Sequence, residues 1–328
     1  MKIVEKEKYL GQIMAPDIAD SIHETVKRRV GVANHSVFEI RAVVDDTRAE
    51  AVGRLSVGFT IWETAVIPAL LHSSEVWVNM RKKTLKLLDK IQLKYLRLVT
   101  GVGTGCPKPI LFYHTGTLSM FNRILMRKIL FLHHVATLPL GCIGRSVYDT
   151  QCKLNQGLVK ELAPYLQEFQ IENIQSYSKF QIRRLVKMKI SDRNECELLF
   201  QAGKYKKISH ELLAQKKFGV HDYFRTLTVS QSRLRFRLYS RMTPRVAMNY
   251  KSDRRFMEMG YQCLGCREAG EPVREETRDT EEHITRCKYY ADLREDLDLD
   301  TDVGIVSYFQ RVISKRADTE KYSEENDF

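Results

Sequence analysis

Apolar side chains recur at three- and four-residue steps along most of the chain, which is the spacing of one face of an α-helix. The exception is the N-terminal segment KYLGQI, which has the pattern of a short strand punctuated by Gly11. The first helical pattern covers residues 22–44, and Asp17 or Asp20 can cap its start. The beginning of the chain therefore predicts one short strand followed by a long helix.

Three further amphipathic helices are predicted in the first part of the chain. Pro68 perturbs the first of them, and the segment 101–109 (GVGTGCPKP) ends the second, because glycine and proline break helices. Thr117 is expected to cap the third, which ends at Pro139 and Gly141. The expected core-facing residues are Leu55, Phe59, Trp62 and Val66, then Leu85, Leu88, Ile91, Tyr95 and Leu98 or Val99, and finally Phe121, Leu125, Ile129 and Leu132.

The middle of the chain predicts a loop region after Gly141 and then shorter helices near 155–170, 177–190, 194–202 and 206–217. A chain of 328 residues with 43% hydrophobic content can bury a substantial core, so it is not a disordered protein. The predicted fold class is mainly α: a multi-helix array with a small zinc-stabilised module toward the C-terminus.

The cysteine count and the N-terminus bear on the compartment. Seven cysteines, an odd number without the spacing of a disulfide framework, favour a reducing environment. The N-terminus lacks the apolar core of a signal peptide, and no stretch approaches the roughly 18 apolar residues of a membrane span. We therefore expect an intracellular protein, nuclear or cytoplasmic, with no membrane partner. Arg183 with Arg184 would permit nuclear import but form too short a cluster to establish it.

A metal-binding motif lies near the C-terminus: Cys263, Cys266, His283 and Cys287 have C-x2-C-x16-H-x3-C spacing. A two-residue gap lets a tight turn aim two thiolates at one point, and a three-residue gap places His283 and Cys287 one helical turn apart. Four such ligands suit one tetrahedral Zn²⁺. The second pair is expected on a helix that Asp279 caps and that runs to about residue 297.

The same motif indicates a structural role for the metal. Four protein ligands leave no open position for water, so the ion would stabilise a small module rather than catalyse hydrolysis. The alternative interpretations are reduced, unliganded thiols or a disulfide. The x16 spacing excludes the short nucleocapsid knuckle of retroviruses, in which the histidine follows the second cysteine much more closely.

The charge distribution favours a polyanionic partner. The formal charge is +12, and basic residues concentrate between about 179 and 255. In SQSRLRFRLYSRMTPR, arginines recur at four-residue steps, so a helix there could follow phosphates; the alternation RLRFRL also suits a strand, and the arginines could simply be solvated. The candidate contacts to RNA or DNA, called the arginine stripe below, are Arg233, Arg235, Arg237, Arg241 and Arg245.

Three other groups only superficially resemble reactive sites. The segment 101–109 follows a helix, lacks the Gly-Lys-Ser/Thr ending of a phosphate loop, and contains two prolines that remove backbone donors. Asp45 and Asp46 lie where a helical pattern ends, without a hairpin to present them as magnesium ligands. His133 and His134 would diverge by about 100° on a helix, which makes a shared metal difficult. We therefore expect no catalytic residue.

Nearly the whole chain resembles the C-terminal part of a reverse transcriptase from a non-LTR retrotransposon. KYLGQIM resembles the strand after the catalytic hairpin, near the primer grip of the palm. WETAVIPALLHSSEVWVNMRKKTLKLLDKIQLKYLRLVTG resembles the thumb and connecting helices, and SRLRFRLYSRM with CLGC and DTEEHITRC resembles the closing basic segment and CCHC zinc module. The family has a Leu-Leu-Tyr-Gly-Ser-Glu-like motif before a tryptophan at this point. His72, Ser73 and Ser74 depart from its Tyr-Gly part, whereas Glu75 and Trp77 match the family.

The resemblance implies a domain order but no active site. The family is an RNA-directed DNA polymerase whose catalytic aspartates lie upstream of KYLG, so they have no counterpart here, and only the four metal ligands carry over. The implied regions are a palm-like strand remnant at 1–15, a thumb-like helical region at 16–140, a helical connector at 141–228, the basic segment and zinc module at 229–297, and an acidic tail at 298–328.

We therefore expect a transposable-element fragment that binds RNA or DNA without catalysis of its own. One alternative is a fragment that works with a palm-containing polymerase chain, which requires an exposed apolar face around residues 1–100. A second is a zinc-supported protein-interaction module, in which the acidic tail covers the arginine stripe. A third is a decayed insertion without a selected function.

Overall fold

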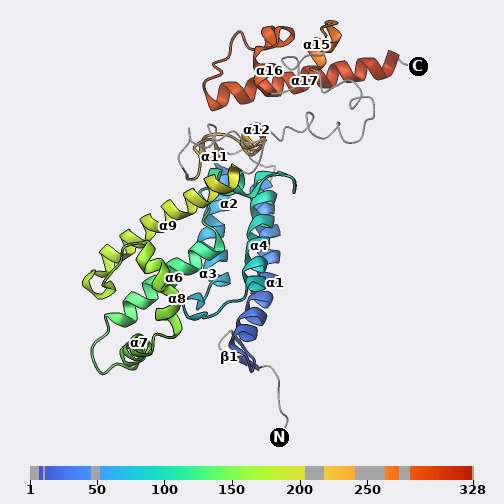
Figure 1. Cartoon of the computed structure of the whole chain (residues 1–328). Helices are drawn as coiled ribbons and strands as arrows, with labels where there is room; N and C mark the ends of the chain where they lie inside the picture. The colour runs from blue at the N-terminus through green and yellow to red at the C-terminus, as the bar shows by residue number, and fades with distance from the viewer. Residues whose placement is uncertain are drawn as a thin grey trace. The chain divides into compact units, whose positions relative to one another are not determined.

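The structure is mainly helical, as the sequence predicts (Figure 1). It is a computed structural model that describes residues 7–9, 12–45, 52–203, 218–240, 263–272 and 281–326. The chain divides into two compact units: unit 1 comprises Met1–Asp46, Ser56–Val99 and Lys108–Val220, and unit 2 comprises Thr47–Leu55, Thr100–Pro107 and His221–Phe328. Within the described ranges, no helix combines the length and apolar character needed to cross a membrane.

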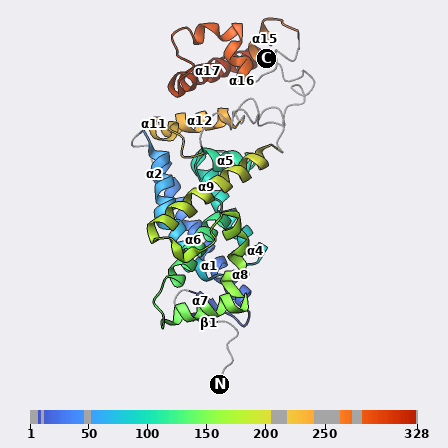
Figure 2. The same ribbon diagram turned by 60° about the vertical axis from the view of Figure 1, so that its left-hand side comes forward.

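Unit 1 is a helical array preceded by a small hairpin (Figure 2). The single strand predicted for KYLGQI is instead an antiparallel pair of short strands, in which Lys8 lies opposite Ile13. The elements of this part of the chain are β1 Glu7–Tyr9, β2 Gln12–Met14, α1 Ile18–Asp45, α2 Arg54–Ile61, a π-turn at Trp62–Val66, α3 Ile67–Leu70, a 3-10 segment at Ser74–Val76, α4 Lys82–Thr100, α5 Lys108–His114, α6 Met120–Ala136, α7 Ile143–Leu154, α8 Gly157–Glu168, a 3-10 segment at Ile174–Ser176 and α9 Lys179–Ala202.

The first predicted helices are confirmed. Asp17 caps α1, because its carboxylate accepts a hydrogen bond from the backbone N–H of Asp20 at 3.2 Å. Pro68 is expected to perturb the next helix, and the residues just before it form a π-turn instead of α-helix. In the core, the ring of Trp62 stacks on that of Tyr95 with centroids 4.0 Å apart. The predicted core positions are buried except Leu85, Leu98 and Phe121, which are half-buried.

A second apolar core joins α6, α8 and α9. Leu132, Leu162 and Val186 contribute one fully buried side chain from each of these helices. Burying a side chain of this size stabilises a fold by roughly 1.5–3 kcal/mol. The packing therefore holds α9 firmly against its neighbours.

The cap predicted for α6 is wrong by two residues. Ser119 precedes the helix in extended geometry, and its hydroxyl accepts from the backbone N–H of Asn122 at 3.2 Å. Thr117 is buried, and its hydroxyl lies 2.8 Å from that of Thr115. Both residues are good capping types, so only the tertiary environment distinguishes them.

The region after Gly141 also differs from the prediction. It contains the helix α7 instead of a loop, because Gly141, with φ +93°, turns the chain and lets a new helix begin after Cys142. The two helices predicted over 177–202 are one continuous helix, α9. Asn194, a weak helix former, is stabilised there because its side-chain oxygen accepts from the backbone N–H of Ser119 at 3.0 Å. The helix predicted near 206–217 lies outside the described residues.

Unit 2 contains the predicted basic segment and metal motif. Its described helices are α11 Tyr223–Thr226, α12 Val229–Tyr239, α15 Leu264–Glu268, α16 Glu281–Arg286, a 3-10 segment at Lys288–Leu293, and α17 Asp302–Asn326. The helical alternative for RLRFRL is confirmed, since α12 covers it and begins with a capping box between Thr228 and Gln231.

Candidate metal centre

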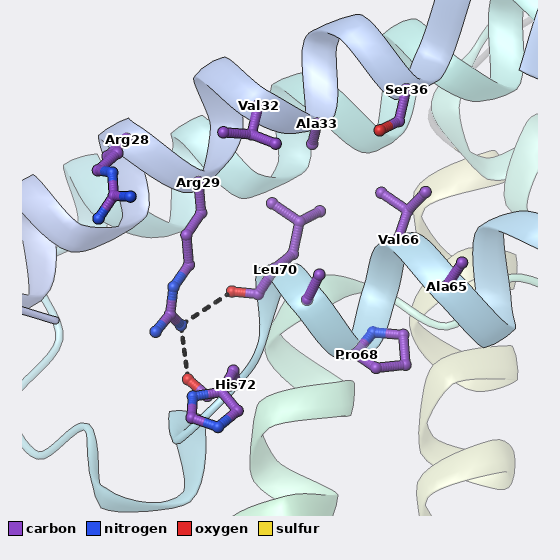
Figure 3. Close-up of a pocket in the computed structure, with 11 residues that line it drawn as sticks. Arg28, Arg29, Val32, Ala33, Ser36, Ala65, Val66, Pro68, Leu70 and His72 are labelled. Carbon is purple, nitrogen blue, oxygen red and sulfur yellow. Dashed lines mark hydrogen bonds between the residues drawn. The ribbon is translucent and has the colours of Figure 1, made fainter. Parts of the chain in front are cut away.

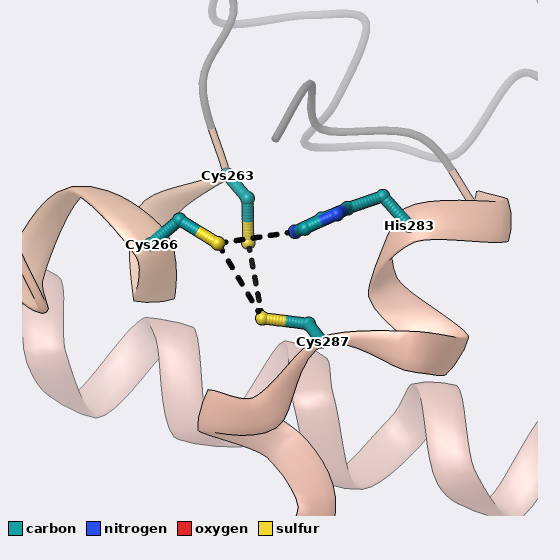
Figure 4. A group of neighbouring side chains, drawn as sticks. All are labelled: Cys263, Cys266, His283 and Cys287. Carbon is teal, nitrogen blue, oxygen red and sulfur yellow. Dashed lines mark hydrogen bonds between the residues drawn. The ribbon is translucent and has the colours of Figure 1, made fainter. Parts of the chain in front are cut away.

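Cys263, Cys266, His283 and Cys287 converge on one point, as the spacing predicts (Figure 4). One donor atom from each residue lies within 4.8 Å of all the others. The three cysteines are buried and His283 is half-buried. These four residues could hold a metal ion such as zinc.

The distances within this cluster fit a tetrahedral ion. The Sγ atom of Cys287 lies 3.9 Å from that of Cys263 and 3.7 Å from that of Cys266. Zn–S bonds of about 2.3 Å at tetrahedral angles would separate two sulfurs by about 3.8 Å. None of the seven cysteines, all of them in described ranges, forms a disulfide. The donor set is therefore arranged as a closed, four-ligand site.

The first pair of ligands is presented by a tight turn at the start of α15. Cys263 precedes this helix with φ −56° and ψ 132°, and its carbonyl accepts from the backbone N–H of Arg267 at 3.0 Å. Gly265 lies between the two ligands, where a Cβ atom would come within 2.6 Å of the Cβ of Tyr289. Only glycine lets the turn and the tyrosine approach so closely.

The second pair shows where the predicted helix is wrong. His283 lies on α16, which ends at Arg286 instead of near residue 297, and Cys287 has extended geometry after it. The Arg294 guanidinium donates to the carbonyls of Thr285 and Cys287, at 2.6 and 3.2 Å. A cation at these carbonyls stabilises the early helix end. The predicted N-cap, Asp279, lies outside the described residues.

The electrostatics among the four side chains oppose thiol ionisation. Burial, with the neighbouring thiols of Cys287 and Cys263, raises the pKa of the Cys266 thiol to about 12. A zinc ion would need the thiolate form, so binding would release protons and weaken as the pH falls.

The helix α17 completes the surroundings of the cluster, which the sequence did not indicate. Arg316 is only 6% exposed; its Nε donates to the Tyr290 hydroxyl at 3.0 Å, and a terminal nitrogen lies 3.9 Å from the Sγ of Cys263. The Tyr308 hydroxyl donates to the carbonyl of Ile284. The signal that could have revealed this helix is its apolar spacing at Val306, Phe309 and Val312, all buried.

The described part of the arginine stripe lies on α12 and makes internal contacts. Arg235 pairs with Asp302, and Arg237 donates to the carbonyl of Gly101 from Nε at 3.2 Å and from a terminal nitrogen at 2.6 Å. Burial, and then the neighbouring Arg233, lower the pKa of Arg237. Arg233, Arg235 and Arg237 are half-buried, whereas Arg241 and Arg245 lie outside the described residues.

The other candidate groups make contacts within the fold, and Asp46 lies outside the described residues. The segment 101–109 ends α4, with Gly101 at φ +67°. Asp45 pairs with Arg41 on the same helix at 3.0 Å. His133 is buried, with Nε2 2.9 Å from the Tyr177 carbonyl, and His134 is exposed.

An apolar groove lies between α1 and α3 of unit 1 (Figure 3). Its volume is about 730 Å³, and Val32, Ala33 and Leu70 contribute to its lining. The Arg29 guanidinium donates across it to the carbonyls of Leu70 and His72, at 3.4 and 2.5 Å. This surface falls within residues 1–100, where one alternative interpretation requires an apolar face.

Comparison of the chain with protein-family models, with curated proteins and with solved structures finds no match.

Proposed function

We propose that the chain binds nucleic acid, that a zinc ion stabilises its C-terminal module, and that it corresponds to the C-terminal part of a non-LTR retrotransposon reverse transcriptase. The observation that carries the proposal is the convergence of Cys263, Cys266, His283 and Cys287 within 4.8 Å. A closed set of thiolate and imidazole ligands suits zinc in a structural role. The formal charge of +12 supports an RNA or DNA partner.

The test measures RNA and DNA binding by the purified, zinc-loaded chain across a salt series. Binding should be steeply salt-dependent, because phosphate contacts release counterions. The variant Cys263→Ser, Cys266→Ser should bind less tightly, with its helicity checked by circular dichroism. The matched control is Cys142→Ser, Cys152→Ser, which changes two exposed cysteines outside the cluster. No binding at low salt would refute the proposal.

A zinc-supported protein-interaction module is a second candidate function. The pairing of Arg235 with Asp302 favours it, because an acidic residue of the tail covers part of the arginine stripe. If this is the function, the chain should bind zinc but should not bind RNA or DNA at any salt concentration. The zinc-loaded titration above therefore separates the two candidates.

A partner chain that supplies a polymerase palm is a third proposal, and the groove between α1 and α3 supports it. Its test is DNA synthesis on an RNA template by the chain mixed with a palm-containing polymerase fragment. Such a complex would be supported if the mixture synthesises DNA but neither component does so by itself. The activity should be lost in Val32→Asp, which places a charge at the groove. Equal synthesis by the palm fragment with and without the chain would exclude it.

A further inference from the structure

The solvent-facing side of α9 carries a dense line of positive charge. Between residues 179 and 191 the sequence contains five basic residues and no acidic one. Lys179, Arg183, Arg184 and Lys187 are all exposed. Because a helix rises about 1.5 Å per residue, these four side chains extend over about 12 Å. They are called the α9 basic line below.

The α9 basic line is not neutralised within the described residues, where no ion pair involves any of its four side chains. The first carboxylate that follows it on the helix is that of Asp192. Glu168 at the end of α8 and Glu197 toward the end of α9 both pair with Arg193 instead. The arginines of α12 differ, since Arg235 has a carboxylate partner.

The buried face of α9 fixes this line in place. Ile182, Val186, Ile190 and Asn194 are buried at four-residue steps. The helix begins with a capping box, in which the Ser178 hydroxyl accepts from the backbone N–H of Gln181 at 3.3 Å. The cations therefore project from a rigid element, so that little backbone entropy is lost when a polyanion binds them.

An exposed aromatic ring accompanies the charges. Phe180 is 74% exposed and Met188 is 51% exposed. Positions two residues apart on a helix point in nearly opposite directions, so Phe180 faces away from the buried Ile182. An aromatic ring among phosphate-binding cations is the combination that stacks on unpaired bases.

We infer that the α9 basic line and Phe180 form a binding surface for single-stranded nucleic acid. The cations contact successive phosphates, and the phenyl ring stacks on one unpaired base. This inference rests on the proposed nucleic-acid binding, and it assigns the contacts to a helix distinct from the arginine stripe.

The charge test compares two triple variants of the full chain, each lowering the formal charge of +12 by three. One is Arg183→Gln, Arg184→Gln, Lys187→Gln; the matched control is Lys82→Gln, Lys86→Gln, Lys90→Gln, which removes three exposed cations from α4. Binding of a single-stranded oligothymidylate is measured across a salt series. Each phosphate contact to a single strand contributes about 0.7 to the slope of log K against log salt concentration. The α9 variant loses three cations, so its slope should fall by about 2 units. The α4 variant should leave the slope nearly unchanged.

The stacking test uses Phe180. Phe180→Ala should weaken single-strand binding by between about 5- and 150-fold, while the same change at Phe200, an exposed phenylalanine at the other end of α9, should not. In Phe180→Trp, indole fluorescence should fall when the oligothymidylate binds. Trp62 and Trp77 are both buried, so the new indole would be the accessible reporter.

The outcomes separate this inference from the proposed function. If the unchanged chain binds neither RNA nor DNA, both fail. If it binds, but the α9 and α4 variants lose equal salt slope, binding follows net charge and the assignment to α9 is wrong. Equal affinity for a duplex and for the single strand, with no effect of Phe180→Ala, would also overturn it.

Discussion

Arg235 on α12 donates to Asp302 at the start of α17, with 2.6 Å between Nε and Oδ1. The same guanidinium lies 4.2 Å from the ring centroid of Tyr239 and donates to its hydroxyl at 2.7 Å. Both charged side chains are largely buried. The pair joins the predicted basic segment to the segment predicted as an acidic tail, so these two parts of unit 2 are one packed structure.

Asp302→Asn should destabilise unit 2 by about 1.5–3 kcal/mol, because the partly buried guanidinium of Arg235 loses its charged hydrogen-bond acceptor. The measurement is urea unfolding followed by circular dichroism. Asp300→Asn is the matched control, since it removes the same charge from an exposed residue of the same segment. If Asp302 also masks a nucleic-acid contact of Arg235, Asp302→Asn should bind RNA or DNA more tightly than Asp300→Asn. Equal stability of the two variants would contradict the structural role of the pair.

Arg316→Gln should weaken zinc binding by about 10-fold or more. Three thiolates and one Zn²⁺ carry a net negative charge, and the buried Arg316 guanidinium lies beside one of the sulfurs. The affinity can be measured by competition with a chromophoric chelator. Arg311→Gln is the control from the same helix, because Arg311 is exposed and pairs with Asp296. The prediction fails if both variants bind zinc equally.

Gly265→Ala should destabilise the metal-loaded module by about 1–3 kcal/mol, since the added methyl group would overlap the base of the Tyr289 side chain. The expected result is a lower unfolding midpoint and weaker zinc retention. Gly103→Ala, also in unit 2, has no atom within 4 Å of the added carbon and serves as the control. A Gly265→Ala chain as stable as the control would show that the turn can rearrange.

The stability of unit 1 should fall at alkaline pH. Burial, and then the nearby Glu195 carboxylate, raise the pKa of Tyr113 from 10.0 to about 12. A raised pKa means that the folded state favours the neutral phenol, so its contribution to stability is complete below pH 10 and is lost as the pH rises toward about 12. Denaturant unfolding at several alkaline pH values measures this loss. Tyr113→Phe should make the decline shallower, and an unchanged decline would contradict the assignment.

The sequence by itself determined the helical class, the extent of several helices and the identity of the four candidate metal ligands. These features depend on local spacing: apolar residues at three- and four-residue steps make one helix face, and the Cys-x2-Cys gap brings two thiols together. The burial of Trp62 and Tyr95 followed from the same periodicity.

Only the tertiary structure decided which side chains each polar residue meets. Thr117 and Ser119 are both capping residue types, and the choice of Ser119 depends on the surroundings of each hydroxyl. Arg235 and Arg183 are both arginines in basic segments, yet the first pairs with Asp302 and the second stays exposed. Arg316 lies beside Cys263, although 53 residues separate them in the chain. Contacts between residues so far apart depend on how helices pack, which local periodicity does not encode.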